Sequence, residues 1–184
     1  MMRRGRAGAG PRRGASDGGR GGGSTRFKMR QKIFAIGDDF WIENEQGQKV
    51  FKVDGKVLRV RDTLKFEDAR GNEIYKIQEK MLRVRDSMTI YKGRDVAAKV
   101  HNALITPLRD RWTVDIPGGQ NMKTQGNILN HEYKIERNGS PVAVVSKRWF
   151  RVRDTYGVEV REGEDALLIL AITVVIDMMA HQGR

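Results

Sequence analysis

The segment from Ala166 to Ile176, Ala-Leu-Leu-Ile-Leu-Ala-Ile-Thr-Val-Val-Ile, restricts the possible folds of this chain more than any other stretch. It contains one polar residue, Thr173. A helix drawn through it has no polar face, which is typical of an element buried on all sides. The segment is too short to cross a bilayer, since a crossing needs about 20 mostly apolar residues. We therefore expect a buried helix over about residues 165–180.

The residues that flank this segment also favour a helix. Asp165, preceded by Glu162 and Glu164, suits a helix N-terminus, and His181 and Arg184 suit a C-terminus. A central β-strand is an alternative, because Ile, Thr and Val crowd the second half of the segment, and membrane insertion is another. Length favours the helix, since strands usually stop at about 4–8 residues.

Short apolar runs separated by polar turns precede the helix and predict about eleven or twelve strands. They include Asn127-Ile128-Leu129 and Val158-Glu159-Val160, and Asp54-Gly55 is a hairpin signal. This number of strands is enough to close a sheet and so to remove its free edges. We predict a mainly β fold, a closed antiparallel barrel of about 12 strands around the buried C-terminal helix.

One six-residue motif occurs three times. The copies are Leu58-Arg59-Val60-Arg61-Asp62-Thr63, Leu82-Arg83-Val84-Arg85-Asp86-Ser87 and Phe150-Arg151-Val152-Arg153-Asp154-Thr155. In a strand, alternation would place the apolar residues of each copy toward the helix and the arginines on the opposite face. The aspartate of each copy is expected to end the run in a turn.

Two interpretations of the six arginines remain open. Arg59, Arg61, Arg83, Arg85, Arg151 and Arg153 could form a surface for an anionic ligand such as phosphate or an acidic head group. Alternatively, each arginine pairs with acids on neighbouring strands, for which Glu43, Glu45, Glu67 and Glu73 are available.

The net charge of +12 is concentrated near the N-terminus. Residues 1–30 hold nine Lys/Arg and one acid, a net charge of +8, and the remainder holds 26 Lys/Arg and 22 acids, a net charge of +4. We expect residues 1–28 to form a disordered Arg/Gly-rich tail and residues 29–184 to form the barrel domain. The tail is either a solvated segment or an arm that contacts nucleic acid or anionic lipid. Whether translation starts at Met1 or Met29 is left open.

The sequence shows no catalytic or metal-binding constellation. Cysteine is absent, no serine lies in a nucleophile elbow, and His101, His131 and His181 lack the spacing of a metal site. We interpret the acidic residues Glu159, Glu162, Glu164 and Asp165 as a charge cluster at the start of the helix, because they lack the pattern of a calcium loop. We therefore expect a protein that is not an enzyme and that holds neither cofactor nor metal.

From about Met29 to Gln182, the chain resembles the LURP-one-related family, which shares its fold with the tubby C-terminal domain and the phospholipid scramblases. The resemblance rests on the repeated Leu-Arg-Val-Arg-Asp unit, the strands joined by glycine turns, and the closing apolar segment. It implies a barrel threaded by a hydrophobic C-terminal helix. The chain departs from the scramblases in having no cysteine for acylation and no proline-rich N-terminal region.

The resemblance also implies a class of ligand. Tubby domains bind phosphoinositide head groups through basic residues, and scramblases act on phospholipid at membranes. We expect a non-enzymatic barrel that binds anionic phospholipid head groups or acts at the membrane surface. The alternatives are a protein-interaction scaffold, and nucleic-acid contact through the basic tail. No transmembrane span is expected, and the expected location is the cytoplasm, peripheral to the membrane.

Overall fold

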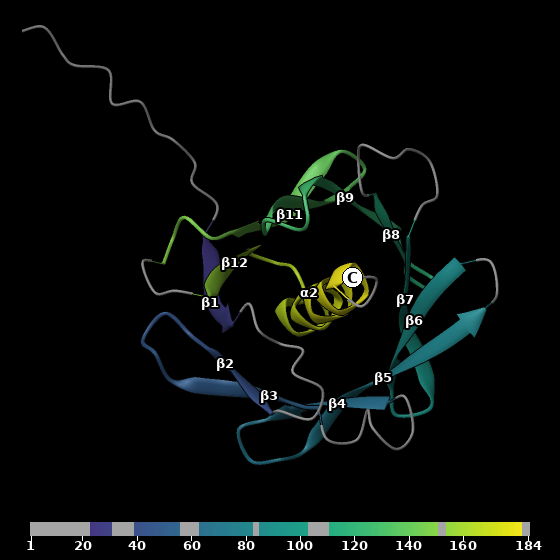
Figure 1. The fold of residues 1–184 in the computed structure, drawn as a ribbon, viewed down its shortest axis with the longest axis horizontal. Helices are drawn as coiled ribbons and strands as arrows, with labels where there is room; N and C mark the ends of the chain where they lie inside the picture. Colours follow the sequence, from purple (N-terminus) through teal and green to yellow (C-terminus); the bar gives the residue numbers. More distant parts are fainter. Residues whose placement is uncertain are drawn as a thin grey trace, which may run out of the picture.

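Twelve antiparallel strands close into a barrel around a C-terminal helix (Figure 1). The structure is a computed structural model that describes residues 23–30, 39–55, 63–82, 85–102, 111–150 and 154–181, apart from the side chains of residues 79–86 and 181. Each strand pairs with its neighbours in the sequence, and β1 pairs with β12 to complete the circle. The predicted mainly β barrel with a central helix is confirmed.

The strands are β1 (Ser24–Arg30), β2 (Phe40–Glu43), β3 (Lys49–Asp54), β4 (Thr63–Asp68), β5 (Glu73–Leu82), β6 (Arg85–Lys92), β7 (Asp95–Asn102), β8 (Trp112–Asp115), β9 (Met122–Asn127), β10 (Glu132–Arg137), β11 (Ser140–Ser146) and β12 (Thr155–Arg161). Alternation of apolar and polar residues explains why these segments form a barrel wall. In β4, for example, Leu64 and Phe66 are buried, whereas Lys65 and Glu67 are partly exposed. Alternate residues point to opposite faces of a strand, so one face supplies the core and the other meets solvent.

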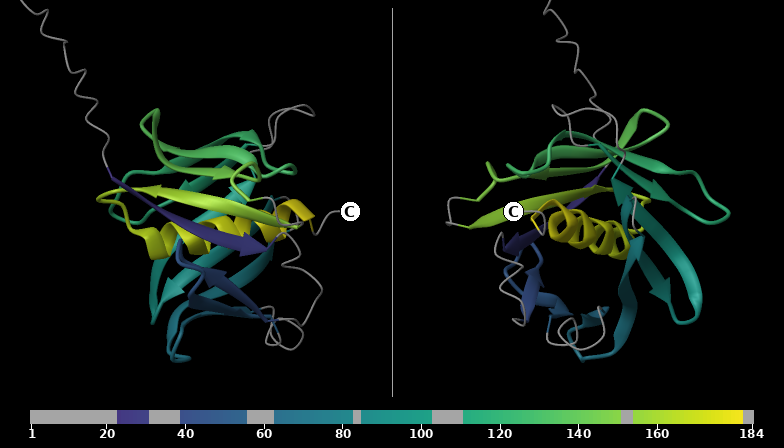
Figure 2. Two further views of the ribbon diagram at one scale, coloured as in Figure 1. Left: turned by 90° about the vertical axis from the view of Figure 1, so that its left-hand side faces the viewer. Right: turned by 45° about the vertical axis from the view of Figure 1, so that its right-hand side comes forward.

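The helix α2 (Ala166–His181) runs through the barrel (Figure 2). The Asp165 carboxylate accepts a hydrogen bond from the Leu168 backbone N–H at 3.0 Å, which caps the helix N-terminus as predicted. Residues 169–178 are buried without exception. Thr173, the polar residue of the apolar segment, donates its hydroxyl to the Ile169 carbonyl at 2.9 Å, so the helix itself satisfies that group.

The up-and-down topology gives the barrel two distinct ends. Connections from an even-numbered strand to the next odd-numbered strand lie at one end, together with the turn from β12 into α2. We call this the α2-start end. Connections from an odd-numbered to an even-numbered strand lie at the other end, where α2 finishes (Figure 2). We call it the α2-finish end.

The first strand begins inside the segment that the sequence assigned to the tail. β1 starts at Ser24, before the expected boundary between residues 28 and 29, and pairs with β12 along all seven of its residues. Phe27 and Met29 are buried, while Arg26, Lys28 and Arg30 alternate with them on the outer face. These cations give the strand a composition like that of the tail, so composition alone extends the tail too far.

Three local expectations differ from the structure. Ile128 and Leu129 lie in the turn between β9 and β10 rather than in a strand. Asp86 lies inside β6 instead of ending a run, whereas Asp154 does lie in a turn, with a φ of 60°. Phe150 precedes β12 outside any strand. Its ring and that of Trp149 pack on the outer wall at Gly157, where an added Cβ would lie 2.9 Å from the Phe150 ring.

Within the described residues, no helix combines the length and the hydrophobicity that a bilayer crossing requires.

Candidate functional site

The structure leaves the predicted arginine surface largely undescribed. Arg59, Arg61, Arg83, Arg151 and Arg153 lie outside the described residues. Arg85 is the first residue of β6, where its backbone pairs with Leu82 of β5.

The described strands that flank the three copies of the arginine motif nevertheless have their ends at the same end of the barrel. They fall in the sequence between β3 and β4, at the junction of β5 and β6, and between β11 and β12. Each of these is an odd-to-even connection, so the strand ends that flank each copy lie at the α2-finish end. The spacing of the copies explains this common end. Two strands separate the first two copies, and an antiparallel chain returns to the same end of the barrel after every second strand.

The described wall of the barrel carries almost no net charge. The described residues include 20 Lys/Arg and 19 Asp/Glu, a net charge of +1 against +12 for the whole chain. Ion pairs join Arg26 to Glu159, Lys28 to Glu43, Lys52 to Asp39, Lys65 to Glu73 and Arg137 to Glu164. Two of the acids that the sequence offered as arginine partners, Glu43 and Glu73, therefore pair with lysines.

The acidic residues around the start of α2 each have a partner in the protein. The Glu159 carboxylate accepts from Arg26, Glu162 from the Gly23 backbone N–H, Glu164 from Arg137, and Asp165 from the Leu168 backbone N–H. These contacts agree with the interpretation of the group as a charge cluster at the helix start. Within the described ranges, no three histidine or acidic side chains lie close enough together to hold a metal ion.

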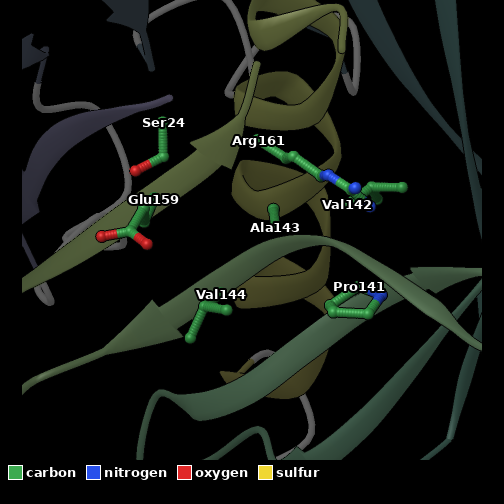
Figure 3. Close-up of a pocket in the computed structure, with 7 residues that line it drawn as sticks. All are labelled: Ser24, Pro141, Val142, Ala143, Val144, Glu159 and Arg161. Atoms are coloured by element: carbon green, nitrogen blue, oxygen red, sulfur yellow. The ribbon is translucent and has the colours of Figure 1, made fainter. Parts of the chain in front are cut away.

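A surface pocket lies at the α2-start end, where β1, β11 and β12 meet (Figure 3). It has a volume of about 250 Å³ and is lined by Ser24, Pro141, Val142, Ala143, Val144, Glu159 and Arg161. Arg161 extends over Val142, and Glu159 lies on the opposite side of the pocket with Ser24 (Figure 3). The pocket thus has an apolar floor between a cation and an anion.

Arg26 holds the Glu159 side of this pocket in place. Its guanidinium donates to the Glu159 carboxylate from Nε, at 3.2 Å, and from Nη2. The same guanidinium lies 4.5 Å from the centre of the Trp149 ring. Stacking of this kind orients a guanidinium that would otherwise move freely. Trp149 in turn rests on Gly157, where an added Cβ would lie 2.5 Å from the Trp149 ring.

A second group of polar residues is buried where α2 finishes. His131, at the β9–β10 turn, places Nε2 2.9 Å from Oδ1 of Asp177 in α2. Tyr156 of β12 donates its hydroxyl to Oδ2 of Asp177 at 2.7 Å, and its ring lies 4.3 Å from the His131 ring. The side chains of His131, Tyr156 and Asp177 have no exposed surface. We call these three residues the buried triplet; it connects the helix to two parts of the wall.

Burial and the Asp177 carboxylate raise the pKa values of two neighbouring tyrosines, Tyr156 and Tyr133. Burial raises the pKa of Tyr156 well above its usual range, and the Asp177 carboxylate adds to this increase. Burial and the same carboxylate raise the pKa of Tyr133 in the same way. Both phenols therefore stay protonated at neutral pH, so Tyr156 remains a hydrogen-bond donor to Asp177. Since no surface of the triplet meets solvent, its geometry suits holding the helix in position.

Sequence reasoning treated the histidines as isolated, and two of them are not. His131 pairs with Asp177, and His101 Nδ1 lies 3.6 Å from Asp115 Oδ2 on the partly exposed outer wall. His131 and Asp177 are far apart in the sequence, so no spacing rule could have joined them. One local signal was present, because a lone Asp directly after the apolar helical run must find a partner if the helix is buried.

Comparison with known proteins supports one family and one fold. A sequence model of the LURP-one-related family matches residues 25–177. Among solved structures, the chain is similar to an X-ray structure of a protein from Arabidopsis thaliana, with a TM-score of 0.66 and 16% sequence identity over 86% of this chain and 92% of that one. No curated protein matches the sequence.

Proposed function

Since the chain belongs to the LURP-one-related family, we propose that it is a non-enzymatic, tubby-like barrel that binds anionic phospholipid head groups at a membrane surface. The observation that supports this proposal is that the strands flanking the three arginine motifs have their ends at the same end of the barrel. A flat bilayer meets one end of a barrel at a time, so cations act together on it only when they are attached to the same end. Each Lys or Arg near an anionic membrane surface contributes about 1 kcal/mol.

The near-neutral wall supports an end-on rather than a side-on contact. With 20 cations against 19 acids, the described residues offer little attraction for an anionic surface. The cations in excess belong to the remaining residues, which include the repeat arginines and the N-terminal segment. A membrane contact through charge therefore depends on one or both of these two sets.

The two sets are attached to opposite ends of the barrel. The segment 1–22 joins β1 at Gly23, and β1 begins at the α2-start end. The repeat arginines flank strand ends at the α2-finish end. The contributions of tail and barrel can therefore be separated by substitution, because one flat surface cannot engage both attachment points in a single orientation.

The absence of enzymatic activity is part of the proposal and is supported by the burial of His131 and Asp177. A histidine beside a carboxylate is the usual core of general-base catalysis. In this protein, both side chains have no exposed surface, so a substrate does not reach them.

Co-sedimentation of the full chain with vesicles tests the proposal. We expect binding to phosphatidylserine/phosphatidylcholine vesicles that falls with added salt, and little binding to phosphatidylcholine alone. The double variant Arg83→Gln/Arg85→Gln should bind several-fold more weakly. The charge-matched control Arg70→Gln/Arg94→Gln removes two exposed cations from turns at the α2-start end and should bind like the unmodified protein.

A further variant assigns the contribution of the tail. It replaces the six arginines of residues 1–22 with Gln in the full chain. Retained binding would attribute the affinity to the barrel. If this variant lost binding while Arg83→Gln/Arg85→Gln bound like the unmodified protein, a site on the barrel would be contradicted. If the unmodified chain did not bind anionic vesicles, the proposal as a whole would be contradicted.

A further inference from the structure

The pocket at the α2-start end exists because two neighbouring strands separate there. β11 and β12 are paired from Ala143 with Val160 to Ser146 with Gly157. The first residues of β11, from Ser140 to Val142, are therefore not paired with the end of β12. The ladder between β10 and β11 also contains an irregularity at Ile135/Glu136, opposite this part of β11. A bulge bends the strand that carries it, which separates β11 from β12 and opens the cavity of about 250 Å³.

The floor of this pocket is apolar and firmly packed. Val142 and Ala143 are 3% and 2% exposed and belong to the barrel core. Pro141 and Val144 contribute side chains that are more exposed, and all four residues lie on β11. Solvent-facing aliphatic carbon in a concave site gains free energy when a ligand's own apolar surface covers it.

The charges on the two sides of the pocket are not equivalent. Glu159 and Arg161 are two residues apart on β12, so they point to the same outer face. Arg26 neutralises the Glu159 carboxylate through two N–H groups. By contrast, Arg161 forms neither a hydrogen bond nor an ion pair through its guanidinium within the described part of the chain. The charge available to a ligand is therefore the guanidinium that extends over Val142 (Figure 3).

We propose that this pocket binds a monocarboxylate that carries a short aliphatic chain. A guanidinium recognises a carboxylate through two parallel N–H···O bonds, which Arg161 has free donors to form. The aliphatic chain covers Pro141 and Val144. A volume of 250 Å³ is below the range of about 300–1,000 Å³ that is usual for drug-sized ligands, so it suits a chain of a few carbons.

The same arrangement disfavours a phosphate dianion. The Glu159 carboxylate lies in the pocket, and although Arg26 pairs with it, the carboxylate is still partly exposed, at 28%. The Glu159 carboxylate repels a second negative charge on a ligand, whereas a monoanion with an apolar body can place its carbon chain beside this carboxylate. The pocket lies at the opposite end of the barrel from the strand ends that flank the arginine motifs, so this inference does not rest on the proposed phospholipid binding.

Titration of the full chain with hexanoate, followed by backbone amide NMR, tests the inference. We expect saturable shifts confined to the amides of residues 142–144 and 159–161. Inorganic phosphate and hexylammonium, at the same concentration and ionic strength, should produce none there. A pentapeptide ending in leucine distinguishes two sources of the carboxylate. Shifts with both the pentapeptide and hexanoate indicate that a peptide C-terminus also fits, whereas shifts with hexanoate alone indicate a free acid.

Two variants keep the test decisive. Arg161→Gln removes the ion pair and should weaken hexanoate binding about tenfold, the equivalent of one charged hydrogen-bonded contact. Val144→Asp places a carboxylate on the floor and should abolish binding. Arg94→Gln, an exposed arginine of a turn at the same end, is the matched control and should leave the affinity unchanged. Equal responses to phosphate and hexanoate, dispersed shifts, or full affinity in Arg161→Gln would overturn the inference.

Discussion

Asp177 illustrates how a single residue connects the helix to the barrel wall. Its two carboxylate oxygens face different parts of the wall, one toward His131 in the β9–β10 turn and the other toward the Tyr156 hydroxyl of β12. His131 reaches this position with a φ of 51°, a left-handed conformation that is uncommon outside glycine. The cost of this backbone conformation is offset by the buried polar contact between His131 and Asp177.

We predict that Asp177→Leu lowers the free energy of unfolding by about 3–5 kcal/mol, because it leaves His131 and the Tyr156 hydroxyl buried without their acceptor. The double variant His131→Leu/Asp177→Leu should lose less than the sum of the two single variants, since the Tyr156 hydroxyl still lacks its acceptor but neither His131 nor Asp177 is left buried without the other. Urea unfolding followed by circular dichroism measures both. Asp95→Leu, at the exposed first residue of β7, is the control and should change stability by less than about 0.5 kcal/mol. Additive losses would show that His131 and Asp177 do not act as a pair.

The buried tyrosines predict a loss of stability in alkali. Burial, together with the nearby Asp165 carboxylate, raises the pKa of Tyr75 to about 12, and burial together with the Asp177 carboxylate raises the pKa values of Tyr133 and Tyr156 well above their usual range. A folded-state pKa above the unfolded value stabilises the fold fully below pH 10 and loses that contribution as pH rises. The urea concentration at the unfolding midpoint should therefore decrease as the pH rises from 10 to 12, and Tyr75, Tyr133 and Tyr156 should contribute tyrosinate absorbance at 295 nm only on unfolding. Early ionisation of these phenols in the folded protein would contradict their burial.

At the scale of the element, α2 is the part of the fold that the sequence predicts best. An apolar run with no polar face has few structural solutions, and the Asp165 cap sets its start. Strands with clear alternation of apolar and polar residues, such as β3 and β4, could also be predicted from the sequence. By contrast, β9 was missed because Met122-Lys-Thr-Gln-Gly-Asn has no aromatic residue and a single β-branched one, Thr124, although Met122 and Thr124 are buried.

The candidate sites were harder to predict from the sequence than the helix and strands were. The arginine motif is contiguous, so its residues could be named, and two-strand periodicity assigns its copies to one end. The pocket depends on where β11 stops pairing with β12, and the buried triplet joins residues from three separate elements. Such contacts depend on register and side-chain direction, which neither composition nor spacing contains.

We predict that Ile172→Asp prevents folding. Ile172 has no exposed surface and lies in the middle of α2, so a carboxylate at this position would be buried without a partner. Val96→Asp is the matched control, because Val96 is 41% exposed on β7 and its replacement should be tolerated. Circular dichroism and size-exclusion chromatography compare the two. A soluble, cooperatively unfolding Ile172→Asp protein would mean that α2 does not occupy the centre of the barrel.

For the whole molecule, the decisive feature is how the barrel closes. Among the described residues, β1 pairs with β12 through seven residues but with β2 through a single pair, Lys28 with Glu43. The ion pairs Arg26–Glu159 and Lys28–Glu43 reinforce β1 on both sides. Closure of the circle therefore depends on a strand that the amino-acid composition had assigned mostly to the tail.

We predict that a chain beginning at Met29 is much less stable than one beginning at Gly23. The shorter chain lacks the buried Phe27 side chain and most of the ladder to β12, so the wall opens beside α2. Thermal unfolding of the two chains is the direct comparison, and we expect the chain beginning at Met29 to aggregate or to melt at a clearly lower temperature. Equal midpoints would show that β1 contributes little to closure.

The position of α2 after all twelve strands also has a consequence for biosynthesis. A ribosome releases the strands first, so their apolar inner faces emerge before the segment that fills the barrel has been translated. Exposed apolar strands are prone to aggregate, and cellular chaperones bind such nascent chains. The native barrel can therefore form only after the final residues of α2 have left the ribosome, and a stop codon that removes the helix should yield an insoluble chain even though every strand is present.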